Sequence, residues 1–221
     1  MIKKKEVGRF RESLLTASLF TYLLFIYHIM NAFFRVRNDK IEYYVDNLSS
    51  ANGRTFERDD GTTKTIRKYS RRALSKIERV VVHHTATKTR SDSYRPDKHW
   101  TPEQLNDLHQ DERGWDRVGY YALVYPDGSA FIVNDLKTVS YHAGGGKNTS
   151  SAGIAFVGNF VNGEKPTNEA YKTFSLLYYD VIMQLGRKVP IEPHKKFMNT
   201  SCPAGVNWEM LNDKLYERKF A

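Results

Sequence analysis

This 221-residue chain contains histidines and a single cysteine, residue types that bind zinc, in two separate segments. An apolar run over residues 80–82 ends abruptly in His83 and His84. More than a hundred residues later, His194 precedes the single cysteine, Cys202, by eight positions. One thiolate and two imidazoles make a tetrahedral zinc set that leaves a fourth position for water, as catalytic zinc sites do. The alternative is a set of scattered polar residues with no shared role.

A sheet is expected to carry these residues. Residues 80–83 are predicted to form a short buried strand, because the apolar run within them is bounded by charge. Residues 120–125 and 130–133 flank a Pro-Asp-Gly turn, and this pattern predicts a hairpin. Two further strands are predicted over residues 138–142 and 153–160, on either side of a glycine-rich loop.

Three helices are expected to pack against this sheet. Thr101 begins a capping-box pattern with proline at the first helical position, and the helix should end at Arg113, before a glycine. Thr167 can cap a long amphipathic helix that ends near Leu185, and a last helix is predicted over residues 206–218. Because strands and helices alternate and one hairpin is antiparallel, the predicted fold class is α/β (mixed), with one central mixed β-sheet flanked by helices.

The net charge of +9 is spread unevenly along the chain. Residues 1–75 hold 15 Lys and Arg against 8 Asp and Glu, whereas residues 76–221 hold 19 against 17. The basic excess therefore lies outside the histidine-containing region, where it could meet lipid headgroups, nucleic acid or another acidic partner. The absence of a recognisable basic helix with base-reading side chains disfavours a nucleic-acid binder. A single cysteine excludes an internal disulfide framework.

The N-terminal part is expected to precede the sheet domain as an appendage. Residues 1–35 combine a basic flank with an apolar helix, because residues 13–34 carry no charge. Such a helix would be roughly 33 Å long, enough to cross a hydrocarbon core of ~30 Å, so an uncleaved membrane anchor is preferred. The competing interpretation is a helix docked in a virion or another assembly. Residues 36–75 are polar and turn-rich and are expected to form a linker arm, which leaves residues 76–221 as the domain.

Eight short motifs follow one another in a fixed order between about residues 76 and 215. They are Val82-His83-His84-Thr85-Ala86-Thr87, Gly114-Trp115, Gly119-Tyr120, Asp127-Gly128, His142-Ala143, Gly158-Asn159-Phe160, His194 and Thr200-Ser201-Cys202-Pro203. This ordered set resembles the zinc-dependent N-acetylmuramoyl-L-alanine amidases of the T7-lysozyme and peptidoglycan-recognition-protein type. Each motif alone is common, but the set with its eight-residue spacing from histidine to cysteine is specific.

The resemblance implies a Zn²⁺ cofactor and a set of reacting residues. His83, His194 and Cys202 match the metal ligands of the family. Tyr120 matches a tyrosine whose hydroxyl reaches the site, where it is expected to donate to the developing oxyanion. Thr200 occupies a position where relatives carry lysine or threonine, and its hydroxyl is expected to assist Tyr120.

The resemblance also implies residues around the substrate. His142 matches a histidine on the wall of the substrate groove, and a hydrogen bond to its own loop is the structural alternative. Asn148 and the glycines at 144–146 are expected to form one wall, since small residues let a glycan approach the backbone. His84 matches a non-ligand position, and Tyr121 departs from the family by standing where histidine is common.

The predicted function is a peptidoglycan hydrolase that cleaves the amide between N-acetylmuramic acid and L-alanine of the stem peptide with a zinc-activated water. A phage endolysin or virion-associated lysin is the preferred setting. The expected location is membrane-anchored, with the domain facing the periplasm or cell wall, and a virion component is the alternative. A non-catalytic peptidoglycan-recognition module and a bacterial wall-remodelling amidase are the rival interpretations. Three filled ligand positions favour an enzyme over the recognition module.

Overall fold

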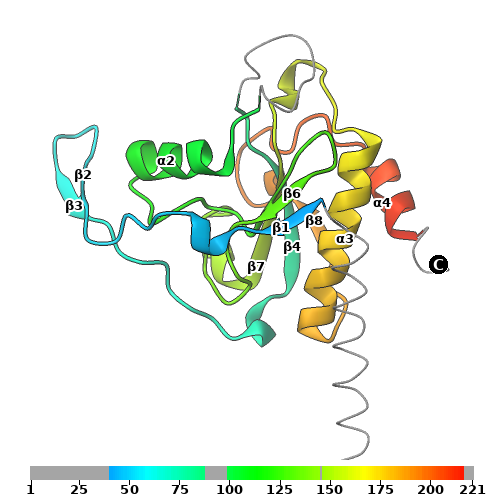
Figure 1. Ribbon diagram of the computed structural model, residues 1–221, viewed down its shortest axis with the longest axis horizontal. Helices are drawn as coiled ribbons and strands as arrows, with labels where there is room; N and C mark the ends of the chain where they lie inside the picture. The colour runs from blue at the N-terminus through cyan, green and yellow to red at the C-terminus, as the bar shows by residue number, and fades with distance from the viewer. Residues whose placement is uncertain (1–39, 88–98, 145, 217–221) are drawn as a thin grey trace, which may run out of the picture. The chain divides into compact units, whose positions relative to one another are not determined.

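A computed structural model describes residues 40–87, 99–144 and 146–216 of the chain (Figure 1). Its main sheet has six strands in the order β1-β6-β5-β7-β4-β8. Only β5 and β6 pair in antiparallel fashion, and the other neighbours are parallel. The predicted class, one mixed sheet with flanking helices, is therefore confirmed. The strands are β1 (Ile41–Tyr43), β4 (Arg79–His84), β5 (Ala122–Val124), β6 (Ala130–Ile132), β7 (Ser151–Phe156) and β8 (Ile191–Pro193).

The central pair of strands is buried on both faces. β4 and β7 run in parallel from the pair Arg79–Ser151 to the pair His84–Phe156. Every residue of β7 is buried, and so is every residue of β4 after Arg79. A strand covered on both sides reads as a continuous apolar run instead of an alternating one, which is why β4 is recognisable in the sequence.

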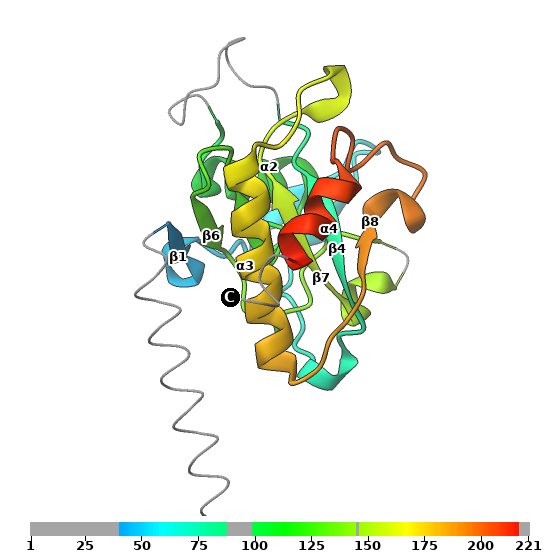
Figure 2. The ribbon, with the colours of Figure 1, turned by 90° about the vertical axis from the view of Figure 1, so that its right-hand side faces the viewer.

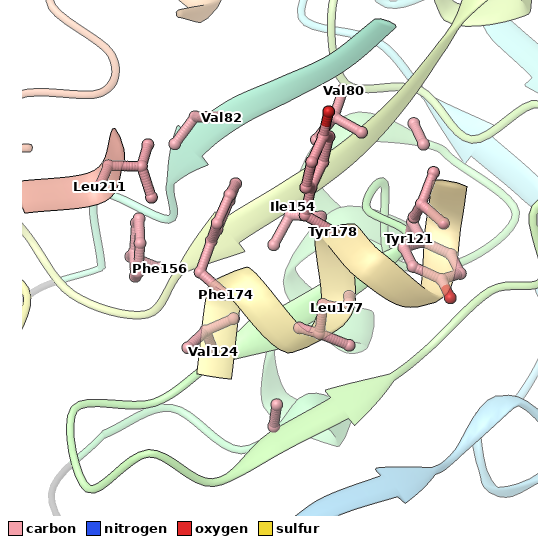
Figure 3. Close-up of a cluster of buried hydrophobic side chains, with 14 of the residues drawn as sticks. Val80, Val82, Tyr121, Val124, Ile154, Phe156, Phe174, Leu177, Tyr178 and Leu211 are labelled. Carbon is pink, nitrogen blue, oxygen red and sulfur yellow. The ribbon is translucent and has the colours of Figure 1, made fainter. Parts of the chain in front are cut away.

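Helices cover the two faces of the sheet. α3 (Asn168–Leu185) and α4 (Trp208–Tyr216) lie side by side on one face (Figure 2). There, Phe174, Leu177 and Leu211 pack with side chains of the sheet (Figure 3). The other face is covered by α2 (Pro102–Arg113), whose Leu105 belongs to a second core cluster with Leu123 of β5. In β5 and β7, neighbouring residues thus belong to different core clusters.

The helix boundaries follow from local capping. Thr101 Oγ1 accepts from the backbone N–H of Gln104, and the Gln104 side chain accepts in return from the backbone N–H of Thr101. Gly114 ends α2 in the left-handed region with φ of 57°. Thr167 caps α3 by accepting from the backbone N–H of Ala170. These contacts confirm the predicted starts of both helices.

Residues 40–75 differ from the expected linker arm because they are built into the sheet domain. The compact unit that contains them begins at Lys40, not at residue 76. β1 is the edge strand beside β6, and its residues Ile41 and Tyr43 pair with Ala130 and Ile132. A separate hairpin of β2 (Thr55–Glu57) and β3 (Thr63–Thr65) follows. Several side chains between β1 and β2 and after β3 are buried, namely those of Leu48, Ala51, Ile66, Tyr69 and Arg72.

The strand expected over residues 138–142 is replaced by irregular backbone with a single bridge. Thr138 pairs with Arg71, and the backbone N–H of Val139 donates to the carbonyl of Ser70 at 2.9 Å. The segment therefore finds its hydrogen-bond partners in residues 70–72 and not in the main sheet. The local sequence of such a short segment cannot reveal which hydrogen-bond partner is within reach.

The structure does not support the expected membrane-anchored location. Within the part of the chain that the structure covers, no helix combines the length and the apolar character needed to cross a lipid bilayer. The apolar segment 13–34, on which the expectation rested, lies outside the described residues. The expected docking of residues 1–35 in an assembly also falls outside them.

Candidate metal centre

The carboxyl ends of two neighbouring parallel strands bring the predicted ligands together. His83 lies near the end of β4, and His194 follows β8 directly, as the first residue of η6 (His194–Lys196). β8 pairs with β4 through Val80–Ile191 and Val82–Pro193, so both histidines emerge at the same edge of the sheet. Cys202 returns to this edge because its carbonyl accepts from the backbone N–H of Lys195 at 2.7 Å.

The three side chains form a compact donor set. One ligand atom from each of His83, His194 and Cys202 lies within 4.8 Å of the others. Sγ of Cys202 is 3.8 Å from Nδ1 of His83, and the two histidine rings have centroids 4.4 Å apart. Tetrahedral zinc with one sulfur and two nitrogen ligands needs sulfur–nitrogen separations of about 3.5 Å. The residues present therefore fit a zinc ion.

An orphaned polar atom points to the same conclusion. Nε2 of His194 is buried and has no hydrogen-bond partner among the described residues. A buried nitrogen without a partner is costly unless something else satisfies it. A metal ion held with His83 and Cys202 would do so, and thiolate with imidazole is a donor combination that suits Zn²⁺.

Burial sets the protonation of the site. Burial lowers the pKa of His83 well below its ordinary value, and burial likewise lowers the pKa of His194. Both imidazoles are therefore neutral at pH 7, the form that binds metals. Burial raises the pKa of the Cys202 thiol to about 11, against a smaller lowering by its hydrogen bond from the backbone of His84. Metal binding at this site must therefore expel the thiol proton.

Tyr120 lies beside the ligands just before β5. Its ring centroid is 5.3 Å from that of His83 and 5.7 Å from that of His109. Burial raises the pKa of Tyr120, so its hydroxyl stays protonated and can donate a hydrogen bond. The Nδ2 of Asn134 donates to the backbone carbonyls of Tyr120 and Val118, at 2.6 and 2.9 Å, and fixes the backbone there.

Thr200 and His84 flank the cysteine. Thr200 Oγ1 accepts from the backbone N–H of Cys202 at 3.2 Å, so this side chain shapes the ligand loop. His84 turns its Nδ1 toward the backbone N–H of Phe160, at 3.4 Å. The structure thus gives His84 a packing role next to the centre, with its backbone N–H facing the sulfur of Cys202 at 3.3 Å.

His142 and Asn148 are engaged within the protein. His142 is 8% exposed, and its Nδ1 lies 3.0 Å from Nε2 of His83. Asn148 Oδ1 accepts from the backbone N–H groups of His142 and Ala143, at 3.0 and 2.7 Å. Direct contact of either side chain with a substrate stays a prediction, and for His142 the hydrogen bonds favour the structural alternative.

Two residues near the centre were not singled out from the sequence. His109 of α2 is buried beside Tyr120, and its Nδ1 accepts from the backbone N–H of Gly119 at 3.1 Å. Arg72 is buried and donates to the carbonyl of Ser151 at 2.6 Å. No local pattern marks either residue, because the partners of each come from separate segments of the fold. Tyr121, the departure from the family pattern, donates to Asp180 at 2.7 Å and belongs to the core.

The described residues thus define an α/β domain with a candidate mononuclear metal centre at the carboxyl edge of its sheet. Comparison with models of protein families matches residues 73–205 to Amidase_2, described as N-acetylmuramoyl-L-alanine amidase. The chain belongs to this N-acetylmuramoyl-L-alanine amidase family. The match includes all three candidate ligands and Tyr120.

Individual relatives agree with this assignment. Peptidoglycan-recognition protein 1 of Holotrichia diomphalia is 32% identical over 90 residues, which are 39% of this chain and 42% of that protein. N-acetylmuramoyl-L-alanine amidase of Mus musculus is 30% identical over 107 residues, 47% of this chain and 20% of that protein. The chain therefore spans less than half the length of these two relatives.

A solved structure extends the comparison. The Ph2119 endolysin of the Thermus scotoductus bacteriophage Ph2119 superposes with a TM-score of 0.54 at 26% sequence identity. The similarity covers 66% of this chain and 89% of the endolysin. Endolysins are thus among the structures that share this fold.

Proposed function

We propose that this chain is a zinc-dependent peptidoglycan hydrolase that cleaves the amide bond between N-acetylmuramic acid and the L-alanine of the stem peptide. The observation that carries the proposal is the convergence of His83, His194 and Cys202 within 4.8 Å at one edge of the sheet. Membership in a family described as N-acetylmuramoyl-L-alanine amidase supports the choice of bond.

The residues around the centre suit amide hydrolysis. A bound Zn²⁺ supplies activation of water and polarisation of the scissile carbonyl. The protonated hydroxyl of Tyr120 provides a donor for negative charge that develops on the carbonyl oxygen. The oxygen of the Thr200 side chain accepts from the backbone N–H of Cys202, and the proposed role of this hydroxyl is to assist Tyr120.

The proposed domain consists of residues 76–221 together with the segment 40–75 that packs on it. The proposed setting is lysis of a bacterial cell wall by a bacteriophage enzyme of the endolysin kind. Likeness to the Ph2119 endolysin over most of that protein supports this setting.

The test uses the full chain on isolated peptidoglycan, with and without a chelator. New amino groups of L-alanine are counted against new reducing sugar ends. The proposal expects amino groups without reducing ends, loss of this activity on chelation, and its return when zinc is added. The Ser201→Ala variant, changed at an exposed residue beside Cys202, serves as a control that keeps activity.

A recognition protein is the competing function, because Holotrichia diomphalia supplies a relative named for peptidoglycan recognition. Zinc bound at one ion per chain, tight binding to peptidoglycan and no new amino groups would support that function and overturn the hydrolase.

A further inference from the structure

Two buried histidines contact each other directly beside the candidate metal centre. Nε2 of His83 lies 3.0 Å from Nδ1 of His142, and the two rings meet edge to face with centroids 5.1 Å apart. Both side chains are almost fully buried, at 1% and 8% exposure. Between two neutral imidazoles, only one of the facing nitrogens carries the proton, so one ring must donate and the other must accept.

The far side of His142 decides which ring donates. Its Nε2 lies 3.4 Å from the carbonyl oxygen of Ser151 and 3.3 Å from Ser151 Oγ. A carbonyl oxygen can only accept. The Ser151 hydroxyl already donates to the carbonyl of Lys147 at 2.7 Å, so it offers His142 only lone pairs. Nε2 of His142 is therefore the protonated nitrogen, and its Nδ1 is an acceptor.

We infer that His142 is a positioning residue that fixes His83 in the tautomer required for metal binding. Because Nδ1 of His142 accepts, Nε2 of His83 must donate to it. Nδ1 of His83 then keeps its lone pair, and this is the atom that lies 3.8 Å from the sulfur of Cys202. The inference rests on the proposed function, since it takes these residues as metal ligands. It gives His142 a role that acts through His83 and needs no contact with substrate.

Metal-binding histidines commonly have a hydrogen-bond partner at the ring nitrogen that does not bind the metal. The second ring nitrogen of a ligand histidine is usually held by a carboxylate, a backbone carbonyl or water, and loss of this partner typically weakens metal binding 10–100-fold. In this protein an imidazole takes that place, and Ser151 fixes the imidazole in turn.

The surrounding fold holds the hydrogen-bonded groups of His83, His142 and Ser151 in place. The guanidinium of Arg72 donates to the same Ser151 carbonyl at 2.6 Å, and Asn148 holds the backbone N–H of His142 at 3.0 Å. Gly153 of β7 leaves space for the imidazole, because a Cβ atom there would come within 2.7 Å of the His142 ring. The absence of a side chain at Gly153 therefore leaves the space in β7 that the His142 ring occupies.

Zinc affinity of the full chain tests the role of His142. The variants H142A, H142N and H142Q are compared with wild type by competition with a chromophoric chelator. Asparagine places an acceptor oxygen near the position of Nδ1, whereas glutamine carries its amide one bond further. We expect about 10–100-fold weaker binding in H142A and H142Q and recovery of most of the affinity in H142N. The absorption spectrum of the cobalt-substituted protein should change in the same order.

A matched control separates this role from a general loss of stability. Tyr178→Phe removes another buried hydrogen bond, from Tyr178 Oη to the carbonyl of Val189 at 2.7 Å, and neither residue is a candidate ligand or a hydrogen-bond partner of His142. It should lower stability and leave zinc affinity unchanged. Equal zinc affinity in H142A and wild type, or equal losses in H142N and H142A, would overturn the inference.

Tautomers measured in the metal-free wild-type protein provide a test that needs no variant. Nitrogen-15 NMR of the histidine rings should find the proton on Nε2 in both His83 and His142. A proton on Nδ1 of either ring would overturn the inference directly. Failure of wild type to bind zinc would instead count against the proposed function, while the tautomers would still report on the contact between the two rings.

Discussion

The sulfur of Cys202 accepts a hydrogen bond from the backbone N–H of His84 at 3.3 Å. The same sulfur lies 3.8 Å from Nδ1 of His83, so the end of β4 supplies both a candidate ligand and a donor to the cysteine. Burial raises the pKa of the thiol to about 11, and this donor offsets part of the rise. A hydrogen bond from N–H favours the anionic sulfur, which prepares the position for a cation.

Cys202→Ser should remove bound zinc and amide hydrolysis together. A serine hydroxyl does not ionise near neutral pH and replaces a soft anionic ligand with a weak neutral one. The measurement is the zinc content per chain after dialysis, together with release of L-alanine amino groups. Ser201→Ala should match wild type in both. One zinc ion per chain in Cys202→Ser would show that the cysteine is not a ligand.

Tyr120→Phe should lower kcat about 10²-fold while zinc stays bound, because it deletes one donor to the developing charge and no ligand. KM should change little, since the interaction is strongest in the transition state. Tyr125→Phe is the control, because Tyr125 donates to the carbonyl of Trp100 at 2.7 Å, away from the ligands. An unchanged kcat in Tyr120→Phe would remove this tyrosine from the mechanism.

Arg72→Lys should destabilise the domain by about 3 kcal/mol, because a single ammonium cannot replace the guanidinium fork. The side chain is buried and donates to the carbonyls of Leu136 and Ser151, at 2.9 and 2.6 Å, and also to those of Asn148 and Thr149. Unfolding in urea measures the change. Arg67→Lys, at an exposed arginine nearby, should stay within about 0.5 kcal/mol of wild type. Equal stability of the two variants would refute the structural role of Arg72.

His109 should make the metal-free protein sensitive to acid. Burial, with a smaller contribution from the charge of Arg113, lowers the pKa of His109 from 6.5 to about 4. Between these values the unfolded chain binds a proton that the folded chain does not. Stability is therefore complete above pH 6.5 and falls as the pH drops toward 4, by about 3 kcal/mol from this group.

The His109→Asn variant isolates this effect. Asparagine can still accept from the backbone N–H of Gly119, as Nδ1 does at 3.1 Å, but it cannot take up a proton. Its free energy of unfolding, measured in urea at several pH values, should fall less steeply than that of wild type between pH 6.5 and 4. Parallel curves would mean that His109 is not held neutral by the fold.

Much of the fold could be predicted because its main elements carry local signals. β4 is an apolar run, and α2 and α3 begin at Thr101 and Thr167 with side-chain caps that the structure contains. β1 has no such signal. Its three residues gain their stability from pairing with β6, about 90 positions away, and a polar local sequence does not encode that pairing.

The candidate site also has a part that the sequence predicts and a part that it does not. His83, His194 and Cys202 could be proposed from residue type and spacing, since few side chains bind zinc. The contact between His142 and His83 could not, because it depends on the ring orientation that Ser151, Asn148 and the small residue Gly153 impose.

The separation of the candidate ligands along the chain has a consequence for assembly. Cys202 lies 119 positions after His83, and β4 reaches His194 through its pairing with β8, more than a hundred residues later. Such non-local contacts form only when most of the fold is in place. A partly folded molecule would therefore not gather the three side chains. In a purified sample, the zinc content would measure the fraction of molecules that have completed the native sheet.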